Sequence, residues 1–362
     1  MLRSLSRETT LVGLFVSLML GCGAPISEEN GAGGTDMAAD MGAAGLEAHL
    51  ANVRQLTFGG ENAEAYFSFD GSQLIFQSTR EGVPCDQIFT VDLDGSNLRM
   101  VSTGDGRTTC GYFYPGGESI LYASTHLGSP ECPPPPSFEA GYVWAVYDTY
   151  DIFRTSSDGM ELTRLTDAPG YDAEATIGPD GRVVFTSVRD GDMEIYSMNG
   201  DGSDVRRLTV RQGPDGGPFF SPDGSRIVFR GREIPDGPEF NDYKRLLDQG
   251  LWRPTELEIF IMDADGGNQR QVTNLVGASF GPFWHPDNER IIFSSNWHNP
   301  SGRNFDLFLI NADGSGLERI TFDESFDGFP MFSPDGGSLV FASNRNAATE
   351  GETNLFLADW IE

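Results

Sequence analysis

Basic residues are scarce in this chain of 362 residues. It has 24 lysine and arginine residues against 54 aspartate and glutamate residues, which gives a formal net charge of -30 at pH 7. A surface of this sign repels phosphate groups, so nucleic acids and anionic lipid headgroups are excluded as partners. Many of the acidic residues stand in tight turns, where aspartate favours the local geometry, and their charge also keeps a protein soluble.

Long apolar runs are also few. The apolar run at residues 11–20 is shorter than the roughly 20 residues that span a bilayer, and it follows Arg3 and Arg7 and precedes Cys22. This order is typical of a secretory signal peptide. The Met19-Leu20-Gly21-Cys22 sequence resembles a bacterial lipobox, which implies cleavage before Cys22 and lipid attachment to it. An ordinary secretory signal with a coincidental cysteine is the alternative.

Residues 23–48 lack aromatic side chains and are rich in glycine and alanine. Such a segment buries too little apolar surface to fold, so it is predicted to be a disordered tether. The predicted organisation is therefore a lipoprotein signal peptide at 1–22, a tether at 23–48 and one domain at 49–362. The expected location is the bacterial cell envelope, with a lipid anchor on the periplasmic or cell-surface side of the outer membrane.

Cysteine is rare as well: apart from Cys22, the chain has only Cys85, Cys110 and Cys132. Three cysteines in an oxidising compartment favour one disulfide and one free thiol, and the sequence does not choose the pair. We expect Cys85 and Cys132 in loops that follow second strands, and Cys110 just before a first strand, all on one face. A structural disulfide and a reactive thiol are the two roles open to these residues.

What the chain has in abundance is one repeated pattern. An apolar run, a tight turn, a second alternating run, a variable loop, a third run, an Asp-Gly turn and a short fourth run predict four antiparallel strands. The first turn occurs six times, at Phe69-Asp70-Gly71, Pro115-Gly116-Gly117, Pro179-Asp180-Gly181, Pro222-Asp223-Gly224, Pro286-Asp287-Asn288 and Pro334-Asp335-Gly336. The second occurs five times, at Asp94-Gly95, Asp158-Gly159, Asp201-Gly202, Asp265-Gly266 and Asp313-Gly314.

The unequal counts indicate how the repeats close. The last repeat stops after its third run, at residues 354–360, whereas residues 53–57 before the first repeat match the fourth runs, such as Arg206-Arg207-Leu208-Thr209. Radial repetition of four-stranded sheets is typical of a β-propeller. We therefore predict an all-β, six-bladed β-propeller in which the N-terminal strand completes the last blade.

The amino-acid sequence of the repeat resembles that of a known protein family. The Phe-Ser-Pro-Asp-Gly turn, the Arg189–Met198 segment and the Arg-Leu-Thr endings resemble TolB-type propellers, which are related to the tricorn and prolyl-oligopeptidase propellers. The resemblance covers residues 51–362 and implies the fold. It does not imply one function, because such propellers serve as scaffolds, peptidase gates and sugar-processing enzymes.

The loops predict which face binds a ligand. In an up-and-down blade both tight turns share one face, and the long insertions at 127–150, 233–257 and 298–305, with a smaller one at 346–353, share the other. Function concentrates where a rigid scaffold varies its loops, so we place the site at the channel mouth on the insertion face. Within the first insertion, the prolines of residues 132–136 and the aromatics of residues 141–147 predict a lid or a sugar-stacking platform, or packing against their own blade.

Aligning the repeats selects candidate residues near that mouth. The ligand-binding candidates are Glu64, His126, Asp172, Glu174, Arg189, Asp215, Trp297, Asp327 and Arg345. Ion pairs of Arg189 with Asp172 and of Arg345 with Asp327 are the structural alternative. His126 with Glu64 and Glu174 is a candidate divalent-metal or acid–base set, and a hydrogen-bonded histidine at a loop base is its alternative. No other cofactor is predicted.

These features predict a non-catalytic binding or scaffold propeller that recognises an envelope protein, peptide or glycan at the channel mouth. Contact with the membrane would be through the lipid anchor alone. One alternative is a metal-assisted lyase or hydrolase acting on glycans. Another is an accessory propeller of a separate peptidase.

Overall fold

The computed structural model describes residues 47–137, 139 and 141–362. The predicted signal peptide, Cys22 and nearly all of the predicted tether lie outside the described residues. No helix in the described part of the chain has the length and apolarity needed to cross a bilayer.

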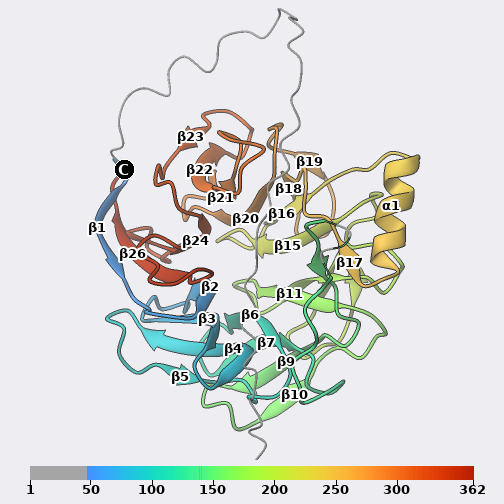
Figure 1. The fold of residues 1–362 in the computed structure, drawn as a ribbon, viewed down its shortest axis with the longest axis horizontal. Helices are drawn as coiled ribbons and strands as arrows, with labels where there is room; N and C mark the ends of the chain where they lie inside the picture. Colours follow the sequence, from blue (N-terminus) through green and yellow to red (C-terminus); the bar gives the residue numbers. More distant parts are fainter. Residues whose placement is uncertain (1–46, 138, 140) are drawn as a thin grey trace, which may run out of the picture. The chain divides into compact units, whose positions relative to one another are not determined.

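Six four-stranded antiparallel sheets surround a central axis, with the first strand of each sheet innermost (Figure 1). Blades 1 and 2 consist of β2 (Glu61–Phe67), β3 (Gln73–Arg80), β4 (Val83–Asp92) and β5 (Arg99–Met100), and of β6 (Thr108–Phe113), β7 (Ser119–Ser124), β9 (Asp151–Ser156) and β10 (Leu162–Arg164). Blades 3 and 4 consist of β11 (Asp172–Ile177), β12 (Val183–Ser187), β13 (Glu194–Met198) and β14 (Arg206–Arg207), and of β15 (Asp215–Phe220), β16 (Arg226–Gly231), β18 (Glu258–Asp263) and β19 (Arg270–Gln271). Blades 5 and 6 consist of β20 (Ser279–Trp284), β21 (Arg290–Ser295), β22 (Asp306–Asn311) and β23 (Glu318–Arg319), and of β24 (Asp327–Phe332), β25 (Ser338–Ser343), β26 (Asn354–Trp360) and β1 (Leu50–Gln55). The predicted six-bladed propeller is confirmed.

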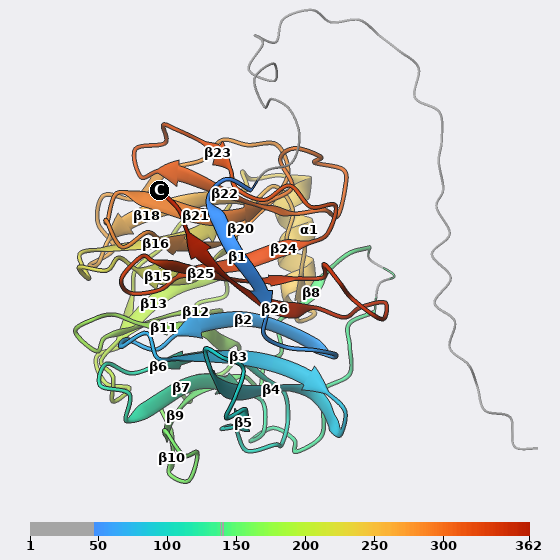
Figure 2. The ribbon, with the colours of Figure 1, turned by 90° about the vertical axis from the view of Figure 1, so that its left-hand side faces the viewer.

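The ring is closed by the N-terminal strand. β1 runs antiparallel to β26, with Leu50 opposite Trp360 and Gln55 opposite Phe356 (Figure 2). Just beyond β1, the Leu56 backbone N–H donates to the Leu355 carbonyl at 2.8 Å. The predicted closure, in which the N-terminal strand completes the last blade, is therefore confirmed.

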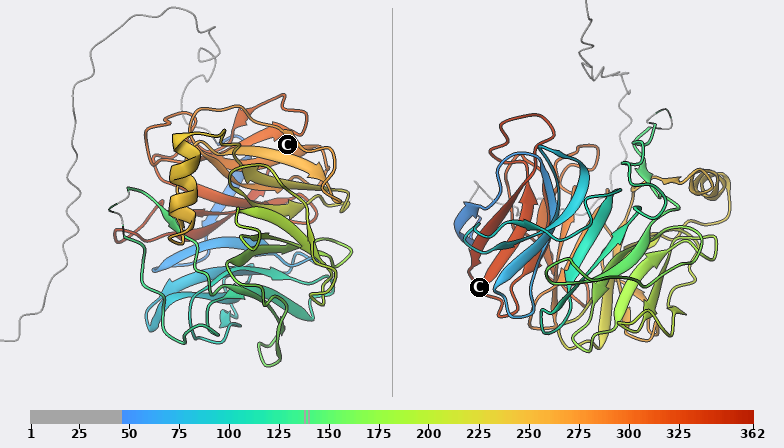
Figure 3. Two further views of the ribbon diagram at one scale, coloured as in Figure 1. Left: turned by 90° about the vertical axis from the view of Figure 1, so that its right-hand side faces the viewer. Right: turned by 90° about the horizontal axis from the view of Figure 1, so that it is seen from below.

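The insertions of blades 2 and 4 add elements outside the six sheets. β8 (Trp144–Ala145) pairs with β17 (Leu251–Trp252), and α1 (Pro238–Leu247) stands outside the blades (Figure 3). The sequence analysis predicted only strands and missed α1. Its signals are local: Pro238 begins the helix, Glu239 lies in the first turn, and Lys244 and Arg245 lie in the last turn, which suits the helix dipole.

Each blade is packed around an aromatic pair that joins its second and third strands. The ring centroids lie 5.6–6.2 Å apart in the pairs Phe76–Phe89, Tyr122–Phe153, Phe185–Tyr196, Phe229–Phe260, Phe293–Phe308 and Phe341–Phe356. Large aromatic surfaces removed from water supply much of the stability of a fold. The core therefore lies within and between the blades, and the space at the axis is left to the first strands.

Cys132 lies in a loop, as predicted, but Cys85 and Cys110 lie in strands. Cys85 lies within β4 and Cys110 within β6, so the prediction of a loop position for Cys85 and of a place before the first strand for Cys110 was wrong. The β3–β4 connection is shorter than the alignment suggested, because β4 already begins at Val83. The structure joins Cys85 to Cys132 in a disulfide and leaves Cys110 as a buried free thiol.

The repeated threonine before each blade connection holds the outer strands together. In five blades its hydroxyl accepts a backbone N–H from the third strand at 2.8–2.9 Å; the pairs are Leu355–Thr57, Ile152–Thr166, Ile195–Thr209, Ile259–Thr273 and Leu307–Thr321. The Thr273 hydroxyl also donates to the Glu258 carboxylate. The buried hydrogen bonds of this threonine thus explain why the Leu-Thr sequence recurs in the repeats.

We predict that Thr273→Val destabilises the protein by about 2–3 kcal/mol. Valine keeps the shape but leaves the Ile259 N–H without its acceptor and the Glu258 carboxylate without one of its donors, and buried unsatisfied groups cost about this much. Urea unfolding at pH 7 measures the change. The control is Thr163→Val in the exposed strand β10, which should stay within about 0.5 kcal/mol. Equal effects of the two substitutions would contradict this account.

Candidate functional site

The first strand of every blade carries a β-bulge at the same place. The register shifts after Ala63, Thr109, Ala173, Gly216, Phe280 and Gly328. The residue that follows each of these has a positive φ of 51–59°, and these six residues are Glu64, Cys110, Glu174, Gly217, Gly281 and Phe329. Non-glycine residues pay about 1–2 kcal/mol for this conformation, and such strain is characteristic of functional sites.

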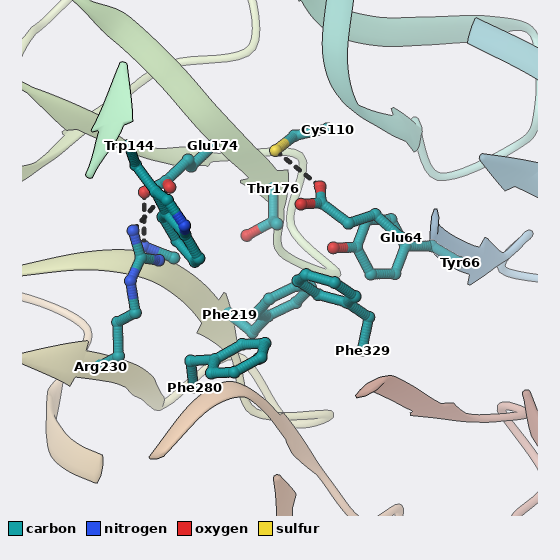
Figure 4. A pocket seen from close by; sticks show the side chains of 12 residues that line it. Glu64, Tyr66, Cys110, Trp144, Glu174, Thr176, Phe219, Arg230, Phe280 and Phe329 are labelled. Atoms are coloured by element: carbon teal, nitrogen blue, oxygen red, sulfur yellow. Dashed lines mark hydrogen bonds and ion pairs between the residues drawn. The ribbon is translucent and has the colours of Figure 1, made fainter. Parts of the chain in front are cut away.

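The six bulge residues ring a central cavity of about 60 Å³. Its other lining residues are Tyr66, Trp144, Thr176, Phe219, Arg230 and Phe280. Figure 4 shows Phe219, Phe280 and Phe329 together on one side, with Glu64, Cys110 and Glu174 on the opposite side. The cavity therefore has one apolar face and one polar face.

Glu174 and Arg230 form an ion pair in the polar face. Arg230 Nη2 lies 2.6 Å from Glu174 Oε1, while Glu174 Oε2 accepts the Thr186 hydroxyl at 2.7 Å and the Gly217 N–H at 2.9 Å. Burial alone would raise the pKa of Glu174, but Arg230 and these donors together lower it. Gly217 leaves room for the Arg230 guanidinium, which a Cβ at that position would displace.

Glu64 has no such cationic partner among the residues that the structure describes. Its Oε2 accepts the Cys110 thiol at 2.8 Å. Burial raises the pKa of Glu64 to about 7; the thiol hydrogen bond lowers it and the nearby Glu174 carboxylate raises it further. Burial also raises the pKa of Cys110 well above its usual range, so this thiol stays protonated and donates. The two carboxyl groups of one cavity thus differ in ionisation: Glu174 is charged at neutral pH and Glu64 is near its midpoint.

The insertions of blades 2 and 4 cover one side of the cavity. Trp144 of β8 meets Trp252 of β17 edge to face, with centroids 5.6 Å apart, and the Arg230 guanidinium lies 5.4 Å from the Trp252 ring centroid. The Cys85–Cys132 disulfide fastens the beginning of the blade 2 insertion to blade 1. The aromatic segment of this insertion therefore reaches the axis as a partial lid, and Trp144 forms part of the cavity wall.

A larger cleft of about 610 Å³ adjoins the cavity on the insertion face and shares Trp144, Phe280 and Phe329 with it. Tyr142, Phe305 and Phe326 add further aromatic walls, and Glu256, Asn296 and Arg303 supply polar groups. Its volume lies within the 300–1,000 Å³ typical of ligand sites. The cleft and the cavity together are the candidate site.

Packed side chains close the channel below the cavity. Tyr66 contacts Tyr112 and Phe219, and Phe219 contacts Phe283, with ring centroids 5.3–5.5 Å apart. A separate hollow of about 220 Å³ lies among the first turns of the blades, on the other side of this layer. The cavity is therefore a closed end that a ligand would enter from the insertion face, where the loops predicted the site.

Most of the predicted site residues do not line the cavity. Asp172 pairs with Arg189 at 2.8 Å and Asp327 with Arg345 at 2.6 Å. Asp215 pairs with Arg211. The residues at the ends of the second strands also cover the aromatic pairs: the guanidiniums of Arg80, Arg189 and Arg345 lie 4.8–5.8 Å from the centroids of these rings. These residues stabilise the blades, as the ion-pair alternative stated.

His126 and Trp297 occupy the same covering position in their blades. The His126 ring lies 4.5 Å from that of Phe153, and its Nδ1 lies 2.8 Å from the Ser124 hydroxyl. The Trp297 ring lies 6.0 Å from that of Phe308. Burial lowers the pKa of His126. Neither residue lines the cavity, and of the predicted residues only Glu64 and Glu174 line it.

The predicted metal set is not assembled. Within residues 47–137, 139 and 141–362, no three or more His, Cys, Asp or Glu side chains are placed to hold a metal ion. His126 turns to Ser124 and Phe153 rather than to the two glutamates. Glu64 and Glu174 instead use a thiol and a guanidinium as partners.

Sequence reasoning missed Arg230. Its register position, opposite Gly216, is filled in the other blades by Gln77, Ala123, Thr186, Ser294 and Ala342. The available signal in the sequence was a charged residue at a position where the other repeats have small or neutral residues. The cavity-lining role of Phe280 had no such signal, because it depends on how the bulge turns the strand.

This geometry defines a six-bladed β-propeller with a cavity and a cleft at one mouth of its channel. Residues 251–356 match the TolB beta propeller domain family. The fold is similar to that of a protein assigned as TolB from Agrobacterium tumefaciens, at 18% identity and a TM-score of 0.52 over 84% of this chain and 91% of that one. It is similar also to that of TolB from Acinetobacter baumannii, at 19% identity and a TM-score of 0.55 over 81% of this chain and 65% of that one. The family match to residues 251–356 and these similar folds support the TolB-type propeller that the repeats predicted.

The fold is also similar to that of an oligogalacturonate lyase in complex with manganese, at 17% identity and a TM-score of 0.50 over 87% of this chain and 95% of that one. No curated protein matches the sequence. At these identities the solved structures support the fold alone, and function must be argued from the site.

We predict that Glu64→Gln stabilises the protein at pH 8 but not at pH 5. A carboxyl whose pKa is raised to about 7 in the folded state favours folding when it is protonated. This contribution is complete below the ordinary pKa near 4.5 and is lost as the pH rises through 7. The variant, which cannot ionise, should therefore gain roughly 1–3 kcal/mol at pH 8.

Urea unfolding at the two pH values measures this difference. Glu118→Gln, in an exposed turn on the opposite face, is the control and should show no pH-dependent difference. A Glu64→Gln effect of equal size at both pH values would show that Glu64 is already ionised in the folded protein at pH 5.

Proposed function

We propose that this protein is a cell-envelope binding propeller that holds a glycan in the cleft on its insertion face. The division of the inner cavity into an apolar and a polar face carries this proposal. Sugar rings have an apolar C–H face that packs on aromatic rings, while their hydroxyl groups need donors and acceptors. Phe280, Phe329 and Trp144, which also line the cleft, offer the first kind of contact to the ring, and Glu174 and Arg230 offer the second to a substituent that enters the cavity.

The shape of the site also supports a glycan. Aromatic side chains continue from the cavity along the cleft, where Phe280 contacts Phe305 at 5.0 Å and Phe326 at 6.4 Å between centroids. Arg303 lies 4.9 Å from the Tyr142 ring centroid at the edge of the cleft. A chain of several sugars would lie along these walls with one end in the cavity. A propeller of similar fold is a lyase of oligogalacturonate, itself an oligosaccharide.

An enzymatic function is the second candidate, favoured by the opposite pKa shifts of Glu64 and Glu174. Two carboxyl groups whose environments separate their ionisation are able to serve as acid and base. In such a reaction the protonated Glu64 would give a proton to the glycosidic oxygen and Glu174 would remain charged. The described residues do not assemble a metal set, so no step through a metal ion is included.

We predict that Trp144→Ala lowers the affinity for a bound oligosaccharide at least tenfold. Trp144 belongs to both the cavity and the cleft, and removing a central aromatic residue from a binding site costs about 2 kcal/mol or more. Glycan-array screening identifies a binding oligosaccharide, and titration calorimetry measures the affinity. Phe58→Ala, which removes a 77% exposed ring away from the site, is the matched control.

An unchanged affinity in Trp144→Ala would contradict this position of the site. Chromatography of the oligosaccharide after incubation separates the two candidate functions. An intact oligosaccharide supports binding alone, whereas cleavage that Glu64→Gln abolishes supports the enzyme.

The location in the envelope follows from the N-terminal sequence. We propose that Cys22 carries lipid and that residues 23–48 tether the propeller to the membrane. The Met19-Leu20-Gly21-Cys22 sequence after a short apolar run supports this anchor. A membrane-bound receptor with a long tether would bring its cleft to glycans of the envelope.

We predict that Cys22→Ala abolishes incorporation of labelled palmitate and releases the protein from the membrane fraction. The substitution removes the thiol to which lipid would be attached. The control is Ser17→Ala in the apolar run, which should leave both properties unchanged. Membrane retention and labelling of Cys22→Ala would show that the signal is not a lipobox.

A further inference from the structure

We propose that the inner cavity binds a positively charged amino group, so that the ligand is a glycan whose terminal sugar carries a free amine. This proposal rests on the glycan-binding function above and specifies its ligand. It assigns Glu64 as the residue that selects the charge. The sugar ring itself would stay in the cleft, because a cavity of about 60 Å³ holds one substituent rather than a whole ring.

The charges around the cavity leave Glu64 uncompensated. Arg230 is already paired with Glu174, so these two side chains together contribute no net charge. The Glu64 carboxyl has a neutral partner, the Cys110 thiol, and stands in a wall of mostly uncharged side chains. A buried carboxylate is stabilised mainly by a cation. An ammonium group in the cavity would supply the missing charge and hydrogen-bond donors.

The aromatic side chains favour the same kind of group. Trp144, Tyr66 and Phe329 line the cavity, and the faces of such rings attract cations. A carboxylate among several aromatic rings is suited to an ammonium group. An anionic group would be repelled by both.

Arg230 supplies an independent indication of a ligand. Its side chain is only 7% exposed, and among the described residues its buried Nε has no hydrogen-bond partner. An unmade hydrogen bond of a buried charged group is costly. A hydroxyl oxygen of an amino sugar would be an acceptor for this N–H, which a simple metal or alkali cation would not provide.

The charge of the whole chain supports the choice. A formal net charge of -30 attracts cationic ligands and repels acidic polysaccharides at long range. The expected ligand is therefore positively charged, whereas the oligogalacturonate of the structurally similar lyase is negatively charged.

The test compares two tetrasaccharides that differ in the nitrogen substituent of every sugar, which is a free amine in one and an uncharged acetamide in the other. Titration calorimetry at pH 7 measures the binding of the glucosamine tetramer and of the N-acetylglucosamine tetramer to the purified protein. We expect the glucosamine tetramer to bind at least tenfold more tightly. Glu64→Gln should remove this preference by weakening the glucosamine tetramer about tenfold, and should leave the acetylated tetramer within twofold. Glu118→Gln is the control for loss of a carboxylate elsewhere.

The pH dependence separates a charge contact from a structural role. The groups that influence the Glu64 carboxyl are Cys110, Glu174, Arg230 and Asp86, and its pKa near 7 means that it takes up a proton as the pH falls. The amines of the glucosamine tetramer gain protons as the pH falls from 7 to 5, but this offsets only part of the loss of the Glu64 charge. The affinity for the glucosamine tetramer should therefore fall about tenfold or more over this range in the native protein, and much less in Glu64→Gln.

Equal binding of both tetramers would overturn this inference and leave glycan binding intact. Equal weakening of both tetramers by Glu64→Gln would also overturn it, because Glu64 would then serve a sugar hydroxyl. Binding of neither tetramer, with no other oligosaccharide bound, would overturn the proposed function together with this inference. Circular dichroism and thermal unfolding confirm that each variant is folded.

Discussion

The pairing of β1 with β26 is the constraint on which the rest of the structure depends. A ring of sheets in which every blade contacts two neighbours leaves only short edge strands, and β1 supplies the fourth strand that blade 6 lacks in its own repeat. Because this strand precedes blade 1 in the sequence, the hydrogen bonds of one blade join the two ends of the propeller. The distance between the six first strands, and with it the width of the central cavity, then follows from the packing of the closed ring.

Such a rigid ring explains how the strained residues persist. Glu64, Cys110, Glu174 and Phe329 all have positive φ values at the same bulge, and a flexible loop would relax them. Here the second strand of each blade holds both sides of the bulge by regular pairing, as Ala63 opposite Gln77 and Tyr66 opposite Ile75 show in blade 1. The bulge turns one residue per blade toward the axis. The site is therefore built from six equivalent positions, and the residue type at each position differs among the blades.

The fold could be predicted from the sequence because its determinants are local and repeated. The Asp-Gly turns and the Leu-Thr endings mark where the strands end, and the missing sixth Asp-Gly turn indicates how the ring closes. Because the loops of a blade alternate between two faces, the long insertions also predict the face on which the cleft lies. The site residues could be predicted only in part. Glu64 and Glu174 were found, but Asp172 and Arg189 satisfy each other, and His126 covers Phe153. A β-bulge in each first strand decides which of two neighbouring residues faces the axis. Such a bulge is not marked in the sequence by a turn motif. Helix α1 was missed because it lies in an insertion outside the repeat.

The contrast between Glu174 and Glu64 shows why the cavity is better understood as a site than as a structural feature. Several buried carboxylates of this propeller are paired with arginine: Asp172, Asp215 and Asp327 each have one, and Glu174 has Arg230 with two further donors. Glu64 occupies the position equivalent to Glu174 but accepts only a thiol, and its raised pKa means that its ionised form opposes folding at neutral pH. A glutamine would fill the same space without this cost. A carboxyl group that weakens the fold, in a strained conformation, beside an unsatisfied Arg230 Nε, is best explained by a partner that arrives from outside the chain and completes its interactions.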